Sequence, residues 1–181
     1  MGTADEKWYL YFYDLQSRDI PKASFPDGYT LHTWQEGAEK IWLDIVSKAF
    51  EPGFLTDWTT ETFIQRYFVK PQFRRDGFFL VKYGNNFIAT AFAWQDEEVS
   101  NQGRLHWLAV LPEHRRKGIA KALCYCVLQY HKHHEKNMVL LKTEVYRDKG
   151  IQLYEKIGFT SQVHSASDKD DKAIYCACSK V

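Results

Sequence analysis

The sequence lacks the features that would place the protein in a membrane, outside the cell or on nucleic acid. No apolar run approaches the roughly 20 residues that a membrane-spanning helix needs. Acidic residues precede the first apolar segment and no small-residue cleavage site follows, which argues against a secretory signal. The 24 Lys and Arg are balanced by 23 Asp and Glu, so the net charge of +1 gives no general attraction to polyanions. We therefore expect a cytoplasmic protein with no membrane or nucleic-acid partner.

Cysteine is also scarce, and its spacing excludes the usual metal and redox motifs. The four cysteines form two pairs, Cys124 with Cys126 and Cys176 with Cys178. Zinc sites and redox motifs use other spacings than a single intervening residue. On a helix such neighbours point about 200° apart, and on a strand their Cα atoms are too far apart for a disulfide. We expect reduced cysteines and no bound metal.

Aromatic residues, in contrast, are abundant. The 181 residues include six Trp, eleven Tyr and twelve Phe, and 45% of the chain is hydrophobic. This composition excludes disordered, collagen-like and low-complexity chains. A chain of this length is expected to form a core without disulfide or metal support. The composition is compatible with a monomer or a homodimer.

The hydrophobic pattern changes its period along the chain. Strands at residues 78–83, 87–94 and 104–111 are joined by short connections and predict an antiparallel meander. A helix at 117–133, an apolar strand at 138–145 and a short helix at 149–157 follow and predict a right-handed parallel crossover. The last residues predict a C-terminal hairpin. We therefore expect an α/β fold with one mixed sheet, antiparallel in its first half and parallel later.

The first 28 residues differ from the rest of the chain. The segment from Trp8 to Leu15 reads WYLYFYDL and is rich in strand-forming aromatic residues, after which prolines and a turn signal close the region. We expect residues 1–28 to form an arm or an edge strand, and residues 29–181 to form the main domain. Within that domain, a strand is expected at 29–34, a capping box of Thr33 and Glu36 predicts that a helix follows and ends at Pro52, and a second helix is expected at about 59–69.

The turn before the long helix is the most informative segment for function. Arg115, Arg116 and Lys117 precede Gly118, and residues 112–121 hold four basic residues and one acidic residue. Backbone N–H groups at a helix N-terminus have no partner in the helix, and glycine has no Cβ to keep an anion away. The turn therefore suits a phosphate or pyrophosphate, although the same charges also suit a plain solvated turn. Neither a dinucleotide fingerprint nor a Walker loop occurs in the chain.

The motif in this turn resembles that of a known family. RRKGIA, from Arg115 to Ala120, matches the Gln/Arg-x-x-Gly-x-Gly/Ala signature of the GCN5-related N-acetyltransferases. LAV precedes it on the preceding strand, and LYEKIGF from Leu153 to Phe159 is similar to the second signature of the family. The resemblance extends from about residue 29 to residue 181. It implies the GNAT fold and an acetyl-CoA-dependent N-acetyltransferase that transfers the acetyl group directly to a primary amine of an unidentified acceptor.

The resemblance also implies how the acetyl-CoA would be held. The pantetheine arm would lie between the strands at 104–111 and 138–145, with backbone contacts from Leu108 and Val110. The pyrophosphate would be held by the backbone of Arg115, Arg116, Lys117, Gly118, Ile119 and Ala120. The sequence departs from the family at Arg147 and Gly150, where Asn and Ala are common. A hydrogen bond to pantetheine is therefore expected to be lost or replaced.

The resemblance places Tyr154 where the family often has its general acid. A phenol with a pKa near 10 suits protonation of a leaving thiolate whose thiol has a pKa of about 8.5. Tyr154 also has the helical spacing of a core aromatic residue.

His106 is the leading candidate for the base. By alternation it shares a strand face with Leu108 and Val110, and LHWLAV resembles the LHALAV of arylalkylamine acetyltransferases. A bulge in this strand would change its direction, and Glu97 and Glu98 are alternative bases acting through water. Phe54 and Trp58 are expected to line a pocket for an apolar or aromatic amine.

Two further hypotheses remain open at this point. The chain is compatible with a non-catalytic module that binds coenzyme A or senses acyl groups. A mechanism through an acyl-cysteine at Cys124 or Cys126 is disfavoured, because both residues lie inside an expected helix.

Overall fold

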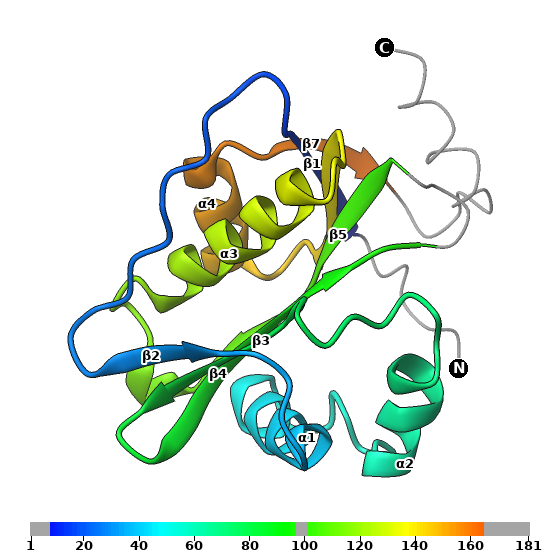
Figure 1. The fold of residues 1–181 in the computed structure, drawn as a ribbon, viewed down its shortest axis with the longest axis vertical. Helices are drawn as coiled ribbons and strands as arrows, with labels where there is room; N and C mark the ends of the chain where they lie inside the picture. Colours follow the sequence, from blue (N-terminus) through cyan, green and yellow to red (C-terminus); the bar gives the residue numbers. More distant parts are fainter. Residues whose placement is uncertain (1–7, 97–100, 165–181) are drawn as a thin grey trace.

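A computed structural model describes residues 8–96 and 101–164 of the chain (Figure 1). These residues form a seven-stranded sheet with the strand order β2-β3-β4-β5-β6-β1-β7. β5 and β6 are parallel, and the other neighbouring strands in this order are antiparallel. The mixed α/β fold with an antiparallel meander and a parallel crossover is confirmed.

The elements follow each other along the chain in nearly the expected order. Their bounds are β1 (Trp8–Asp14), β2 (Tyr29–His32), α1 (Ala38–Ala49), α2 (Thr60–Phe63), the π-helical turn η1 (Ile64–Phe68), β3 (Phe78–Tyr83), β4 (Asn86–Trp94), β5 (Gln102–Val110), the 3₁₀ helix η2 (Pro112–His114), α3 (Ile119–His133), β6 (Met138–Glu144), α4 (Asp148–Ile157) and β7 (Thr160–His164).

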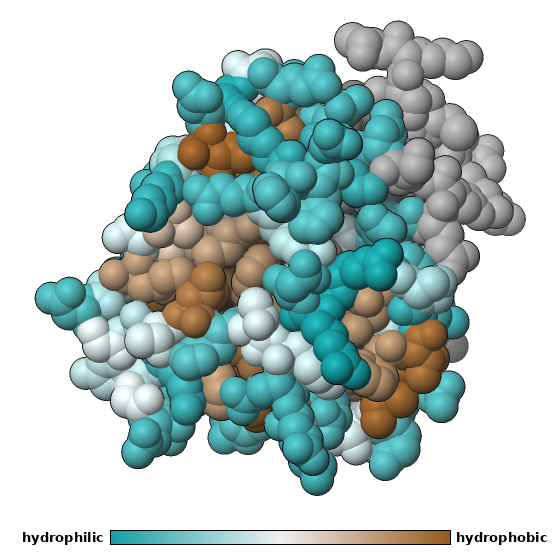
Figure 2. Space-filling model, viewed as in Figure 1, coloured by the Kyte–Doolittle hydropathy of each residue, from teal (hydrophilic) through white to brown (hydrophobic). Residues whose placement is uncertain are grey.

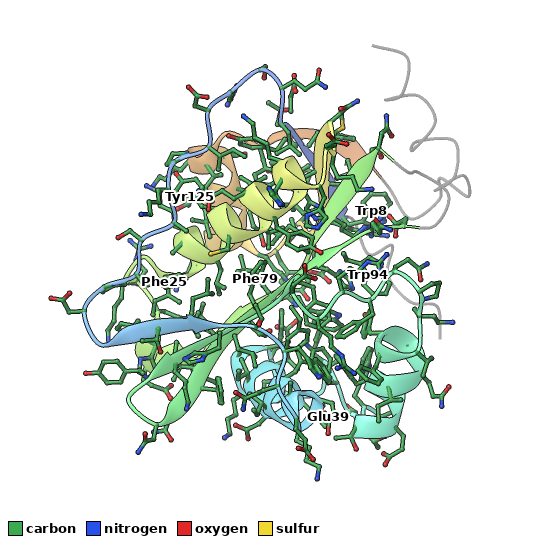
Figure 3. All side chains as sticks on the ribbon, viewed as in Figure 1. Trp8, Phe25, Glu39, Phe79, Trp94 and Tyr125 are labelled. Carbon is green, nitrogen blue, oxygen red and sulfur yellow. The ribbon has the colours of Figure 1, made fainter. Side chains whose placement is uncertain are left out.

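The helices cover the two faces of the sheet separately. Consecutive strand residues point to opposite faces. Phe78 of β3 contacts Phe63 of α2 with ring centroids 6.1 Å apart, whereas the next residue, Phe79, contacts Tyr130 of α3 at the same distance. α1 and α2 therefore lie on one face and α3 on the other. Figure 3 shows the side chains that fill the space between the sheet and these helices, with Phe79 on the side of α3.

α4 lies on the same face as α3. Gly103, Val139 and Tyr13 stand directly across from one another on β5, β6 and β1. His131 of α3 lies against Gly103, and Phe159, just after α4, packs on Tyr13 with ring centroids 5.2 Å apart. Helices α3 and α4 thus share one face, and the face of α1 and α2 is free of both.

The core on the α1 side is built from aromatic rings. Trp42 of α1 is fully buried, and Phe63, Phe92 and Trp107 lie 4.9, 6.0 and 5.0 Å from it between ring centroids. Edge-to-face and offset pairs of this kind stabilise a core beyond the area that they bury. On the outer surface, Figure 2 shows hydrophobic areas that are separated by hydrophilic residues, one of them over α2.

The position of β1 differs from the expectation for residues 1–28. The segment is a strand, but it lies between β6 and β7 and pairs with both, so it is not an edge strand. Leu10 and Tyr11, which point to opposite faces, are both almost completely buried. A strand buried on both faces has a continuous apolar sequence, and WYLYFY is such a sequence. The division of the chain at residue 28 stays a prediction.

The C-terminal hairpin was expected from residues that the structure describes only in part. β7 is the first strand of that hairpin, and it pairs with β1. The expected second strand, within residues 172–181, lies outside the described residues. Cys176 and Cys178 lie in the same segment. Cys124 and Cys126 are buried and free, as expected for reduced cysteines.

The contact between Gly103 and α3 generates a prediction about stability. A Cβ atom at residue 103 would overlap the buried imidazole of His131. We expect Gly103→Ala to lower the free energy of unfolding by about 1–3 kcal/mol, the usual effect of overpacking, measured by urea denaturation with Trp fluorescence.

Gly150→Ala is the matched control. A Cβ there would lie 3.6 Å from the Tyr154 ring, an ordinary contact, and alanine favours a helix over glycine by about 0.5–1 kcal/mol. The control should be as stable as the wild type or more so. Equal stability of Gly103→Ala and the wild type would contradict the packing described for α3.

Candidate functional site

The candidate site lies where β5 and β6 stop pairing. The parallel register joins Gln102 with Met138, Gly103 with Val139 and Arg104 with Leu140, and no later pair follows. β5 remains paired with β4 up to Val110, and β6 remains paired with β1 up to Glu144. The C-terminal halves of β5 and β6 therefore separate from each other while each keeps its outer neighbour. Residues 106–108 are partly exposed there, between buried residues 105 and 109–110.

A bulge in β5 lies at this point. Phe92 stands across from His106 and Thr90 across from Ala109, so β5 has one residue more than β4 in this interval. Trp107 takes up the extra residue with a φ of 52°, in the left-handed region. The bulge reverses the alternation of side chains. His106 shares the α1–α2 face with Ala109, and the expectation that it shares a face with Leu108 and Val110 is wrong.

His106 is held in a hydrogen-bonded group with Tyr67 and Trp107. The Tyr67 hydroxyl lies 3.0 Å from His106 Nε2 and accepts a hydrogen bond of 2.7 Å from Trp107 Nε1. Burial, together with the charge of Arg104, lowers the pKa of His106 to about 3. The imidazole is therefore neutral at physiological pH. Sequence reasoning missed Tyr67, because its contacts with His106 and Trp107 join segments that are about 40 residues apart in sequence.

Phe54 and Trp58 both lie around Trp107, and their expected role in an acceptor pocket stays a prediction. The Trp58 ring is 5.4 Å from Trp107 and is stacked 6.1 Å from Tyr67. Phe54 is 36% exposed, and its ring lies 6.2 Å from Trp107. Trp58 thus packs mainly against Trp107 and Tyr67, whereas Phe54 is partly exposed to solvent.

Arg147 joins the loop after α1 to the turn before α4. Its guanidinium forms ion pairs with Glu51 at 2.8 Å and with Glu144 at 2.5 Å. It also lies over the rings of Phe50 and Phe54, at 4.7 and 5.0 Å from their centroids. Burial acts to raise the pKa of Glu51, but hydrogen bonds from Tyr146 and Arg147 lower it. Arg147, one of the two residues that depart from the family pattern, therefore contacts both carboxylates and aromatic rings on the α1 side.

The basic turn has the geometry of an open helix N-terminus. Gly118 precedes α3 with a φ of 84°, and none of the described side chains caps the helix. No atom lies within 4 Å of the place where a Cβ of Gly118 would stand. Arg116 and Lys117 are exposed. Together these features leave the first N–H groups of α3 accessible to an anion.

Arg115 has a different position from the two bases that follow it. Its Nε donates to the carbonyl of Val110 at 3.0 Å, and its Nη2 donates to the carbonyl of Ala49 at 2.5 Å. The side chain therefore anchors the turn to the end of β5 and to the end of α1. Its backbone N–H donates to the carbonyl of Pro112 at 3.2 Å, so its role in holding phosphate stays a prediction for the remaining N–H groups of the side chain.

Tyr154 lies on α4, on the opposite face from His106. Its half-buried ring packs against Tyr11 and Phe159, with centroids 6.1 and 6.0 Å apart. Tyr11 in turn donates a hydrogen bond to Glu155, which connects α4 to β1. Burial raises the pKa of the Tyr154 phenol above its usual value, so the hydroxyl is protonated at neutral pH. The structure thus places the two expected catalytic residues on either side of the separated strands.

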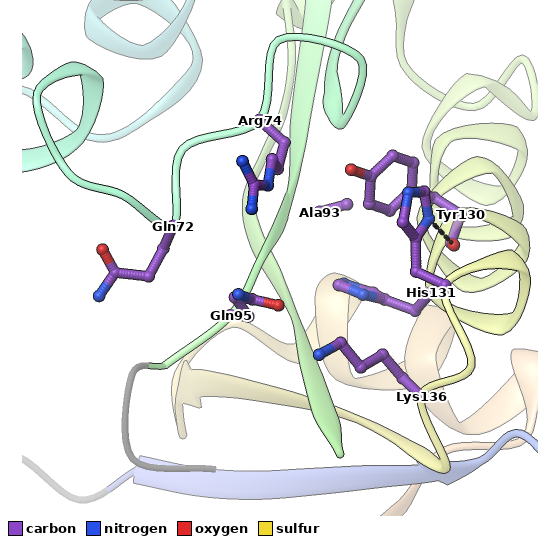
Figure 4. Close-up of a pocket in the computed structure, with 8 residues that line it drawn as sticks. Gln72, Arg74, Ala93, Gln95, Tyr130, His131 and Lys136 are labelled. Atoms are coloured by element: carbon purple, nitrogen blue, oxygen red, sulfur yellow. Dashed lines mark hydrogen bonds between the residues drawn. The ribbon is translucent and has the colours of Figure 1, made fainter. Parts of the chain in front are cut away.

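A polar pocket elsewhere contains none of the expected site residues (Figure 4). Its volume is about 160 Å³. It lies at the C-terminal end of α3, which as a 15-residue helix is about 22 Å long. The basic turn at Gly118 is at the other end of the same helix. The lining residues are Gln72, Arg74, Ala93, Gln95, Tyr130, His131, His134 and Lys136.

Neither a metal-binding cluster nor a membrane-spanning helix occurs among the described residues. Residues 8–96 and 101–164 contain no group of three or more His, Cys, Asp or Glu side chains that would hold a metal ion. No helix in these ranges combines the length and the apolar character needed to cross a membrane.

Known proteins resemble this chain in sequence. A mycothiol acetyltransferase of Thermobispora bispora is 28% identical over 152 residues, which cover 78% of this chain and 50% of the relative. N-alpha-acetyltransferase 30 of Schizosaccharomyces pombe is 30% identical over 101 residues, which cover 54% of this chain and 65% of the relative. The chain thus spans about half the length of its mycothiol acetyltransferase relative.

Structural and family comparisons agree with these relatives. The crystal structure of a GCN5-related N-acetyltransferase from Sphaerobacter thermophilus matches with a TM-score of 0.74 and 17% identity, over 90% of this chain and 50% of that chain. At this identity the likeness shows the fold alone. The profile of the Acetyltransferase (GNAT) family matches residues 40–159, which include the bulge, the basic turn and α4. The chain therefore belongs to the acetyltransferase (GNAT) family.

Proposed function

We propose that the chain is an acetyl-CoA-dependent N-acetyltransferase that transfers the acetyl group directly to a primary amine. The observation that carries the proposal is the separation of β5 and β6 beside the open, basic N-terminus of α3. The separated strands leave unpaired backbone groups for an amide-containing arm, and the turn provides N–H groups for its phosphates. Membership of the GNAT family supports the same donor.

The donor would be held by the turn and by the separated half of β5. Gly118, Ile119 and Ala120 offer their backbone N–H groups to the pyrophosphate, and the exposed side chains of Arg116 and Lys117 add positive charge. Leu108 and Val110 follow the bulge and offer backbone groups on the side from which β6 has moved away.

The chemistry requires one proton to leave the amine and one to reach the sulfur. The amine lone pair attacks the thioester carbon, so that a C–N bond forms, and the C–S bond then breaks with departure of the thiolate. We assign protonation of that thiolate to Tyr154, whose raised pKa keeps its proton until the negative charge develops. We assign acceptance of the amine proton to the hydrogen-bonded group that contains His106, on the α1 side of the separated strands.

The acceptor would approach from the α1 side, where His106 lies. Phe54 and Trp58 surround Trp107 there, and Phe54 is exposed. We therefore propose an acceptor amine with an apolar or aromatic part. We further propose a cytoplasmic protein, monomeric or homodimeric, that needs no membrane or nucleic-acid partner.

Tyr154→Phe tests the assignment of the acid. The variant keeps the packed ring and loses the proton donor, so kcat should fall about 100-fold, the lower end of the usual contribution of acid catalysis. The dissociation constant of acetyl-CoA, measured by calorimetry, should stay within about twofold of wild type, since the ring contacts persist. Thiol release from acetyl-CoA across an amine panel is the rate measurement.

Tyr125→Phe is the control for this variant, because it removes a phenol from α3 outside the proposed site. An unchanged kcat in Tyr154→Phe would sink the assignment. Tight binding of coenzyme A by the wild type with no thiol release on any amine would instead favour a binding or acyl-sensing module.

Gly118→Val tests the anion site. Valine in the left-handed conformation is strained by about 1–3 kcal/mol, and its side chain would fill the space over the first N–H groups of α3. The dissociation constant of acetyl-CoA should rise about tenfold or more. Gly84→Val, another glycine with positive φ and open surroundings, is the control for strain alone. Equal affinity of both variants for acetyl-CoA would remove the turn from the proposed site.

The cysteines provide a test against an acyl-cysteine mechanism. Burial raises the pKa of Cys126 to about 11 and raises that of Cys124 further, so both are thiols, not thiolates, at pH 8. In a Cys176→Ser/Cys178→Ser variant, a thiol reagent at pH 8 should label neither residue until urea unfolds the protein. An acetyl group on Cys124 or Cys126 in the intact mass after incubation with acetyl-CoA would contradict direct transfer.

A further inference from the structure

The hydroxyl group of Tyr67 lies next to His106, the expected base, on the face of the sheet that α1 and α2 cover. Tyr67 lies in η1, and π-helical turns are rare and often occur at functional sites. Its ring is fixed by Trp58, Phe92 and Trp94, at centroid distances of 6.1, 5.6 and 5.3 Å. The hydroxyl group therefore has little freedom to leave its two partners on β5.

The direction of the two hydrogen bonds follows from the groups involved. An indole N–H is only a donor, so Trp107 Nε1 donates to the Tyr67 oxygen. None of the described residues other than His106 accepts the hydrogen of the Tyr67 hydroxyl. We therefore take Tyr67 as the donor to His106 Nε2, which requires the neutral imidazole tautomer that carries its hydrogen on Nδ1.

This arrangement determines how His106 can act as a base. Nε2 holds the basic lone pair, and that lone pair already accepts the Tyr67 hydrogen. A proton that comes from the acceptor amine therefore has no direct approach to Nε2. The phenolic oxygen accepts one hydrogen bond from Trp107 and keeps a second lone pair. That lone pair is the position at which an incoming N–H group can be received.

We propose that Tyr67 is a catalytic residue of the acetyl transfer, whose hydroxyl takes up the proton of the acceptor amine while passing its own proton to His106 Nε2. This proposal rests on the proposed function. The step balances: the amine N–H bond breaks, a new O–H bond forms on Tyr67, the former O–H bond breaks, and the imidazole becomes imidazolium. The imidazolium then loses a proton to solvent before the next acceptor binds, which regenerates the neutral base.

The surroundings of the Tyr67 oxygen act on this transfer in two directions. Burial raises the pKa of Tyr67, but the Trp107 N–H group and the charges of Arg66 and Arg104 act in the opposite direction. A hydrogen bond that stabilises the charged form helps the oxygen through the partial negative charge that it carries during transfer. Arg104 opposes a positive charge on His106, so the imidazolium forms only transiently.

Tyr67→Phe is the direct test, because it keeps the ring and removes the oxygen. We expect kcat to fall about 10- to 100-fold, within or just below the usual effect of a proton-transfer group, with the KM for acetyl-CoA unchanged. The acidic limb of the kcat profile should also move to higher pH. Tyr67 donates to the neutral imidazole, so its loss raises the pKa of His106, and the base is then lost to protonation at a higher pH.

Tyr130→Phe is the matched control. Tyr130 is also half-buried, and its hydroxyl donates to Asp76 at 3.1 Å on the other face of the sheet. This variant should keep the wild-type kcat and pH profile. Thermal unfolding of both variants shows whether a loss of activity reflects a loss of folded protein.

A double-mutant cycle separates relay from simple packing. His106→Asn keeps a polar amide but has no basic nitrogen. If Tyr67 acts through His106, adding Tyr67→Phe to His106→Asn should change kcat by less than about twofold, because groups in one network are not additive. Additive losses, or a wild-type kcat in Tyr67→Phe alone, would overturn the proposal.

A spectroscopic measurement keeps the proposal distinguishable from the proposed function. The ¹⁵N shifts of the His106 ring should show a protonated Nδ1 and an unprotonated Nε2 in the wild type, and an altered Nε2 shift in Tyr67→Phe. A protonated Nε2 in the wild type would contradict the relay whatever the activity. Failure of the wild type to release thiol from acetyl-CoA with any amine would contradict the proposed function and leave the measured tautomer as it is.

Discussion

The candidate site depends on one extra residue in β5. Up to Arg104 this strand bonds to neighbours on both sides, and after the bulge at Trp107 it keeps only β4. A bulge increases local twist and bends the strand. In β5 the bend coincides with the loss of β6 as a partner, so that backbone groups on the inner edges become available for other bonds. Because the bulge follows His106, it leaves this residue on the α1 face and turns Leu108 and Val110 to the other face. The Trp107 indole at the bulge contacts Tyr67. The space for a ligand and the separation of His106 from Leu108 and Val110 thus have the same origin.

Much of the fold follows from sequence patterns, and its differences from expectation have local causes. The strands of the meander, the long helix and the crossover have clear periods, and the structure has them within a few residues of the expected bounds. The place of β1 is not a local property, because a strand buried on both faces has the same sequence pattern wherever it lies in a sheet. β1 pairs with β6 and β7, which lie far along the chain, so its position depends on long-range pairing.

The site was predictable to different degrees for different residues. Gly118 and the bases before it form a contiguous motif, and the structure shows the open helix N-terminus that the motif predicts. Alternation could not predict that His106 and the residues after Trp107 lie on different faces, since a single inserted residue reverses every later side chain. Tyr67 has the spacing of an ordinary helical residue, and its contacts with His106 and Trp107 join segments that are about 40 residues apart in sequence. Arg147 was visible as a departure from a family pattern, but its link to Glu51 joins segments that are remote in sequence.

The interior position of β1 also has a consequence for the order in which the protein becomes complete during synthesis. Residue 8 pairs with residue 144, so the ribosome must translate most of the chain before β1 can find its first partner. Contacts of such long sequence separation slow folding, and unpaired strands that wait for a partner expose aggregation-prone edges. Tyr11 of this strand also holds α4, the helix that carries Tyr154. β1 is therefore translated long before its partners and is among the last strands to be fixed, and the packing around the proposed acid is completed with it.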